Sequence, residues 1–213
     1  MDSLQENFRI LRIRVESQTA LPAIVVVSAS MSGDGTTYVA SGLARAFAEA
    51  GHRTLLLEAN TARPGVADQL DIRPIPPTCT AAGLHARTAE VPGLWVTALR
   101  GGPADGTMRE LTTRMRNEFA VTVIDAAAIP TSSPALQHSH ADDALLVAVR
   151  TGRRACAADQ ELLRLIGDGD VRLLGIVPTK ARGRRVAAPL STPQLVPEVE
   201  APAHFAPRAG ARG

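Results

Sequence analysis

Lysine is almost absent from this chain of 213 residues, which contains only Lys180. Aromatic residues make up 3% of the sequence, too few for a surface of stacked rings that would bind nucleic acid bases. The 23 basic and 21 acidic residues leave a net charge of +2, which does not indicate a polyanionic partner. We therefore expect no nucleic acid partner.

Cysteine and long apolar runs are also scarce. The two cysteines, Cys79 and Cys156, form no CxxC motif or metal-ligand spacing, and such usage is typical of a reducing compartment. No apolar run approaches the roughly 20 residues of a membrane-spanning helix, and the first residues do not form a signal-peptide pattern. These absences predict a cytoplasmic protein, for which a role at the membrane requires recruitment to its inner face.

Apolar runs alternate with helical patterns along most of the chain. Runs that predict strands cover 23–28, 53–58, 94–99, 121–125, 144–150 and 172–177. Helical spacing of apolar residues predicts helices over 2–17, 37–50, 107–117, 133–141 and 155–167. Because several strands are apolar on both faces, the pattern predicts an α/β fold of three layers around a doubly wound, mostly parallel sheet.

The first predicted strand leads into a glycine-rich turn, and residues 24–37 read IVVVSASMSGDGTT. In a phosphate-binding loop, backbone N–H groups cradle the phosphates, a lysine neutralises them, and the next Ser or Thr holds Mg²⁺. The glycines and the Mg²⁺-binding Thr37 stand at the expected positions, but Thr36 replaces the lysine. The predicted nucleotide-binding residues are Ser32, Gly33, Asp34, Gly35, Thr36, Thr37 and Tyr38.

Two later strands end in acidic residues. Glu58 closes the run TLLLE, and Asp125 closes the run VTVID. In phosphate-loop proteins the second such residue orients Mg²⁺, and a residue on the first can polarise an attacking hydroxyl. We predict a Mg²⁺ site at Thr37 and Asp125.

Together with ENFRILR before the first strand, these motifs resemble the bacterial tyrosine kinase family. Its members are cytoplasmic ATPase-like domains, related to the MinD/ParA group, that pair with polysaccharide chain-length regulators. The resemblance extends from about Glu6 to Lys180. It implies a phosphate-loop NTPase fold, ATP or ADP with Mg²⁺ as ligands, and the cytoplasmic tail of a membrane chain-length regulator as a partner.

The family's oligomerisation motif, Glu-x-x-Arg-x-x-Arg, is intact at Glu6, Arg9 and Arg12. By resemblance, these residues imply contacts between subunits. The assembly would be a homo-oligomer or a hetero-oligomer with an intact kinase relative.

The chain departs from the family pattern where the chemistry is carried. Besides Thr36, the family motif Asp-x-Asp-x-Arg is replaced by Glu58, Ala59, Asn60, Thr61 and Ala62, and Arg63 follows. The resemblance therefore implies a degenerate catalytic set of Glu58, Asn60 and Asp125. The C-terminal tail lacks the tyrosines that the family phosphorylates, since the chain's one tyrosine is Tyr38. These departures predict weak or lost nucleotide binding and a pseudokinase.

The patterns divide the chain into an oligomerisation helix (1–20), a phosphate-loop NTPase-like domain (21–181) and a disordered Pro/Ala/Arg-rich tail (182–213). The favoured function is a degenerate tyrosine-kinase-like subunit that regulates or assembles exopolysaccharide or capsule export. One alternative is a slow but active tyrosine kinase or ATPase of the same pathway. The other, a MinD/ParA-type partition ATPase, is less favoured because that group has an extra loop lysine where this chain has Met31.

Overall fold

The computed structural model describes residues 3–72, 78–79, 85–99, 105–129, 144–168 and 172–179. The helix predicted over 133–141 and the tail predicted over 182–213 lie outside the described residues. Within the described ranges, no helix is both long and apolar enough to cross a membrane.

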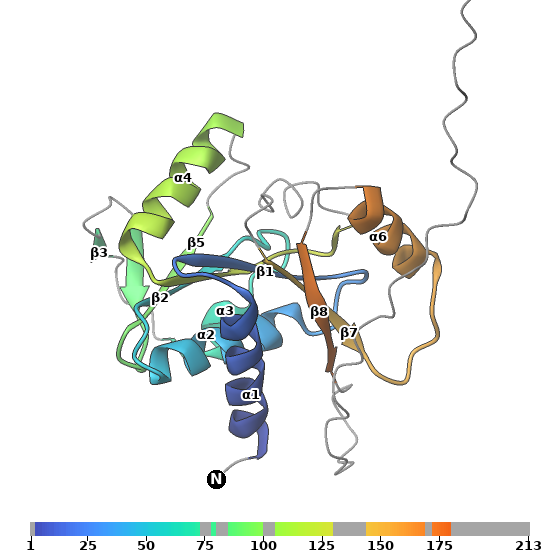
Figure 1. The fold of residues 1–213 in the computed structure, drawn as a ribbon, viewed down its shortest axis with the longest axis horizontal. Coiled ribbons are helices and arrows are strands. Elements are labelled where there is room, and N and C mark those ends of the chain that lie inside the picture. The colour runs from blue at the N-terminus through green and yellow to red at the C-terminus, as the bar shows by residue number, and fades with distance from the viewer. Residues whose placement is uncertain are drawn as a thin grey trace, which may run out of the picture.

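A twisted sheet with the strand order β3-β4-β5-β2-β6-β1-β7-β8 forms the centre of the described structure (Figure 1). Its parallel strands are β1 (Ala23–Ala29), β2 (Thr54–Glu58), β5 (Leu94–Ala98), β6 (Val121–Asp125), β7 (Ala144–Arg150) and β8 (Arg172–Thr179). Each of them coincides with a strand predicted from an apolar run, so the predicted α/β fold with a mostly parallel sheet is confirmed.

Three short elements are not predicted by the sequence patterns. Strands β3 (Thr78–Cys79) and β4 (His85–Thr88) pair antiparallel with each other, and β4 extends the sheet by pairing antiparallel with β5. Helix α3 (Val66–Gln69) follows β2. Each is too short to display a hydrophobic period, which needs several repeats to be recognised.

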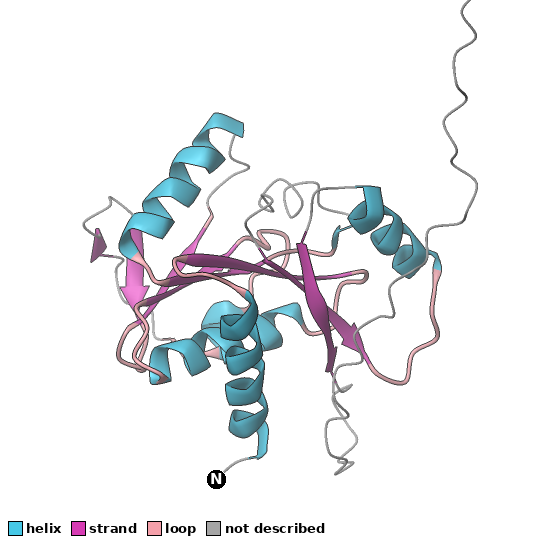
Figure 2. Ribbon diagram, in the orientation of Figure 1, coloured by secondary structure: helices cyan, strands magenta, loops and turns pink. Residues whose placement is uncertain are grey.

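Helices cover both faces of the sheet (Figure 2). On one face lie α1 (Ser3–Gln18), α2 (Thr36–Glu49) and α3, and on the other lie α4 (Asp105–Glu118) and α6 (Ala157–Asp168). Side chains of β1 alternate between the two layers: Val25 and Val27 belong to the core that includes α2, whereas Ile24 and Val26 belong to the core that includes α4 and α6. This double burial explains why the strand is apolar throughout.

Helix α1 is packed on α2. The Phe8 ring lies so close to Gly42 that a Cβ at this position would be 2.3 Å from it. At the other end of α1, Glu16 Oε2 accepts from Arg12 Nη1 at 2.5 Å, and His52 Nε2 lies 2.9 Å from Glu16 Oε1. The helix predicted to mediate oligomerisation is therefore also joined to the α/β domain through its inner face.

The carboxyl ends of the central strands meet at one edge of the sheet. Strand β1 lies between β6 and β7, so the chain passes to opposite sides of β1 as it continues to β2 and later to β7. Open parallel sheets bind ligands at such a switch point, beyond the carboxyl ends of the strands. The register of β2 and β6 places Glu58 directly opposite Asp125 at this edge.

Candidate functional site

The glycine-rich turn forms the connection from β1 to α2 at this edge. Gly33 and Gly35 have φ angles of 90° and 96°, values that glycine adopts without the steric cost of a side chain. A Cβ at Gly35 would also lie 3.1 Å from the Thr179 side chain. The first N–H groups of α2 have no partner within the helix, which is the usual basis of anion binding at such loops.

Thr37 and Asp125 form a hydrogen-bonded pair at the carboxyl edge of the sheet. The Thr37 hydroxyl donates to Asp125 Oδ2 at 2.7 Å. Asp125 is fully buried, and its Oδ1 has no hydrogen-bond partner among the described residues. Burial raises the pKa of Asp125 to about 6, with a further increase from the charge of Glu58, while the hydroxyls of Thr37 and Thr36 oppose the shift.

This pair fits a Mg²⁺ site of the kind that accompanies a nucleotide. Mg²⁺ is usually held by one or two protein oxygen ligands together with water and phosphate oxygens. The described part of the chain has no group of three or more His, Cys, Asp or Glu residues that could hold a metal, so a metal ion here would depend on Thr37, Asp125 and the ligand itself. The Oδ1 atom of Asp125, which has no partner among the described residues, is consistent with that arrangement. Thr36 has no positive charge to neutralise the phosphates.

Glu58 and Asn60, which the sequence assigns to catalysis, bond to the turn between β2 and α3. Glu58 Oε1 accepts from the backbone N–H groups of Gly65 and Val66 at 2.5 and 2.8 Å, and so caps α3. Asn60 Oδ1 accepts from the backbone N–H of Arg63 at 3.2 Å. No sequence pattern predicts this capping, because α3 is too short to display a hydrophobic period. The assignment of Glu58 and Asn60 to catalysis stays a prediction.

The same turn carries a basic side chain to the phosphate loop. Arg63 is exposed, and its Nη1 donates to Ser32 Oγ at 3.1 Å. Ser32 is itself an exposed residue of the loop. The sequence places Arg63 directly after the altered motif, and only the folded structure brings it to the loop.

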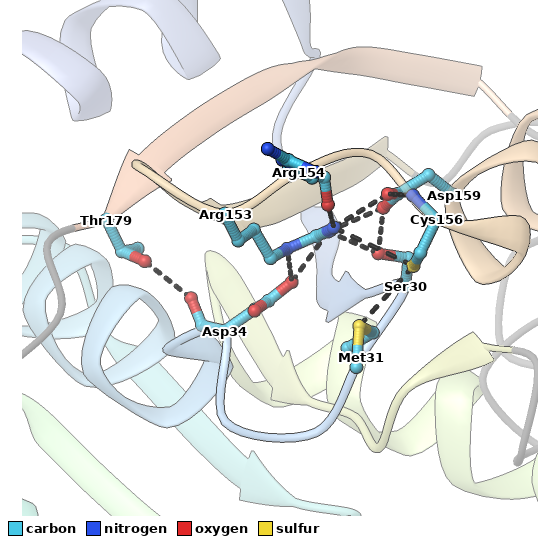
Figure 3. Close-up of polar contacts among 8 residues, drawn as sticks. All are labelled: Ser30, Met31, Asp34, Arg153, Arg154, Cys156, Asp159 and Thr179. Atoms are coloured by element: carbon cyan, nitrogen blue, oxygen red, sulfur yellow. Dashed lines mark hydrogen bonds and ion pairs between the residues drawn. The ribbon is translucent and has the colours of Figure 1, made fainter.

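A second arginine fastens the loop to the segment between β7 and α6 (Figure 3). Arg153 donates to Asp34 Oδ2 from Nε at 3.2 Å and from Nη2 at 3.0 Å. It also donates from Nη1 to Asp159 Oδ2 at 2.6 Å and from Nη2 to Ser30 Oγ at 2.8 Å. The carboxylates of Asp34 and Asp159 thus both bind the guanidinium of Arg153, although these two residues are far apart in sequence.

The charge of Arg153 is already balanced within this network. Its pKa is held above the ordinary value, chiefly by hydrogen bonding to Asp159, and the pKa of Asp159 is held far below the usual range by Arg153. Asp34, predicted to bind nucleotide, has a buried side chain turned to Arg153, and its carbonyl accepts from Thr179 Oγ1 at 2.6 Å. Its side chain therefore shapes the loop.

Tyr38 and the residues of the predicted oligomerisation motif lie on the α1 side of the molecule. The Tyr38 ring packs edge-on against Phe8, with ring centroids 5.3 Å apart, and its predicted nucleotide contact stays a prediction. Arg9 Nη1 lies 3.5 Å from Glu6 Oε2, and both side chains are accessible. Arg12 instead turns toward Glu16.

No protein-family model matches the chain. It is 25% identical over 195 residues to the succinoglycan biosynthesis transport protein ExoP of Rhizobium meliloti, a match that covers 82% of this chain and 25% of ExoP. The chain therefore spans about a quarter of the length of that relative.

Solved structures share the fold. The kinase domain of the Escherichia coli tyrosine kinase ETK superposes with a TM-score of 0.66 at 16% identity, covering 86% of this chain and 79% of that domain. The septum site-determining protein MinD of Pyrococcus horikoshii, complexed with Mg-ADP, gives 0.57 at 12% identity, covering 72% and 68%. The resemblance predicted from the motifs is confirmed: the chain has the phosphate-loop α/β fold found in bacterial tyrosine kinase domains and MinD.

Proposed function

We propose that this chain is a degenerate, tyrosine-kinase-like subunit that regulates or assembles a polysaccharide export system at the inner face of the cell membrane. The pathway is supported by the similarity to a succinoglycan transport protein. The partners proposed are an intact kinase relative or further copies of the chain, together with the cytoplasmic tail of a membrane chain-length regulator.

The observation that carries this proposal is the state of the phosphate loop. Its backbone conformation and the Thr37–Asp125 pair are retained, while the lysine position holds Thr36. Glu58 caps α3. Asn60 carries a neutral amide, which cannot act as a general base. A charge preorganised on a transferring phosphoryl group is typically worth about 10²–10³ in rate, so its loss favours a binding role over catalysis.

A slow ATP-dependent tyrosine kinase or ATPase of the same pathway is the second candidate. It is favoured by the intact Thr37–Asp125 pair, which fits Mg²⁺. The first candidate binds ATP or ADP weakly or not at all, whereas the second must bind ATP and react with it.

Assembly through α1 is supported by the character of its outer surface. Ile10 and Ile13 are 45% and 55% exposed, and each lies one helical turn after a member of the accessible Glu6–Arg9 pair. A carboxylate and a guanidinium can form directional pairs across an interface. We propose that another kinase-like subunit covers this surface.

Mixing the purified chain with a cognate, catalytically intact kinase domain tests the proposal. We expect light scattering to detect a complex heavier than either component and the phosphotyrosine content of the kinase to change at least several-fold. Glu6→Ala/Arg9→Ala should abolish both effects, whereas Arg14→Ala, which removes a positive charge elsewhere on α1, should retain them. Unchanged mass and unchanged phosphorylation in every mixture would contradict the regulatory function.

A further inference from the structure

The phosphate loop has a basic side chain beside it that does not come from the loop sequence. Arg63 reaches Ser32 Oγ from the turn between β2 and α3, with Nη1 at 3.1 Å. Its backbone is held by Asn60 Oδ1, which accepts the Arg63 N–H at 3.2 Å. The guanidinium is therefore positioned at the outer edge of the loop by a defined turn.

The other arginine that contacts the loop cannot perform the same task. Arg153 is bound to Asp34 and Asp159, and its side chain is only 12% exposed. A phosphate group approaching it would compete with two carboxylates. Arg63, by contrast, forms no ion pair with a carboxylate of the described residues, and it is exposed.

A separate observation indicates that the loop is a ligand site and not merely a turn. Asp125 is fully buried, and its Oδ1 has no partner among the described residues. Its Oδ2 accepts from Thr37 at the start of α2. A buried carboxylate oxygen without a partner is costly, and a cation brought by a phosphate ligand would satisfy it.

We propose that Arg63 takes the place of the missing loop lysine and binds the phosphate chain of a nucleoside di- or triphosphate. The inference rests on the proposed function only for the ligand class, because it concerns binding and requires no turnover. Arginine suits the task because its planar guanidinium presents several N–H donors to phosphate oxygens. Reaching the loop from another turn, it supplies the charge that Thr36 does not.

Calorimetric titration of the purified chain with ATP and, separately, with inorganic pyrophosphate, each with Mg²⁺, tests this assignment. Arg63→Ala should lower the affinity for both ligands about tenfold, as expected for the loss of one charge-assisted contact at an exposed site. Arg63→Lys should retain most of the affinity. Arg154→Ala is the matched control, because it also removes an arginine, and the Arg154 side chain forms no bond in the network around Arg153 (Figure 3). We expect Arg154→Ala to leave the affinity for both ligands unchanged.

A second pair of variants separates this inference from the rest of the account. In a Thr36→Lys background the loop has its own cation. Arg63→Ala should therefore lower the affinity for ATP less than threefold in that background. Equal affinities of the wild type and Arg63→Ala, or equal losses for Arg63→Ala and Arg154→Ala, would overturn the assignment. Binding by Thr36→Lys alone would also overturn it, because Arg63 would then not replace the lysine. None of these results depends on whether the chain regulates a kinase.

Discussion

Thr36→Lys is expected to tighten ATP binding about 10- to 100-fold in the presence of Mg²⁺. The loop has its left-handed glycines, the start of α2 and the Thr37–Asp125 pair in place. The substitution therefore adds a cation within a loop of suitable shape, in addition to the charge of Arg63 at the outer edge of the loop. Thr36 is half-buried at the first position of α2, where a long side chain can extend toward the phosphates.

Thr36→Gln is the control for this prediction, because it lengthens the side chain without adding charge. Calorimetry at low and moderate salt should find that only the lysine variant gains affinity and that the gain decreases as salt is raised. If the lysine and glutamine variants bind ATP equally well, the absent charge is not what limits binding.

Asp125→Asn is expected to stabilise the protein by about 2–3 kcal/mol at pH 8. The pKa of Asp125 rises from 3.8 to about 6 on burial, so above pH 6 the folded state must hold a carboxylate that the unfolded chain exposes to water. As the pH falls from about 6 to 4, the folded state takes up this proton before the unfolded chain does. The strain from Asp125 is thereby relieved, and the advantage of the variant should disappear near pH 4.

Urea unfolding of the wild type and the variant at pH 5 and pH 8 measures this difference. Asp159→Asn provides the opposite control, because the pKa of Asp159 is lowered by Arg153 and its removal breaks an ion pair. That variant should lose stability at pH 8. Equal unfolding free energies for Asp125→Asn and the wild type at both pH values would mean that the buried carboxylate is not strained.

The sequence predicts the parallel strands well because they are unbroken apolar runs, and burial on both faces of a sheet is the structure that explains such runs. The loop and its partner Asp125 are predicted for a related reason. The loop follows β1 and Asp125 is the last residue of β6, and parallel strands bring their carboxyl ends to one edge of the sheet. Local patterns therefore suffice for this half of the site.

The other half depends on contacts that no local pattern contains. Arg153 and Asp34 are separated by 119 positions, and only the pairing of β1 with β7 brings them together. The sequence signal for Arg153 is only an arginine shortly after a predicted strand, and arginine is common on protein surfaces. The position of Glu58 in a motif predicts a catalytic role, whereas the cap that it provides requires α3, an element too short to predict.

ATP turnover by the wild-type chain is the most direct test of the central claim, that this fold retains a nucleotide cradle and has lost its chemistry. Phosphate release and phosphotyrosine should be measured with saturating ATP and Mg²⁺, beside Asp125→Ala as the inactive reference. We predict that the two proteins give the same background rate and that neither carries phosphotyrosine. Sustained phosphate release or tyrosine phosphorylation that disappears in Asp125→Ala would contradict the claim and identify the chain as a working enzyme.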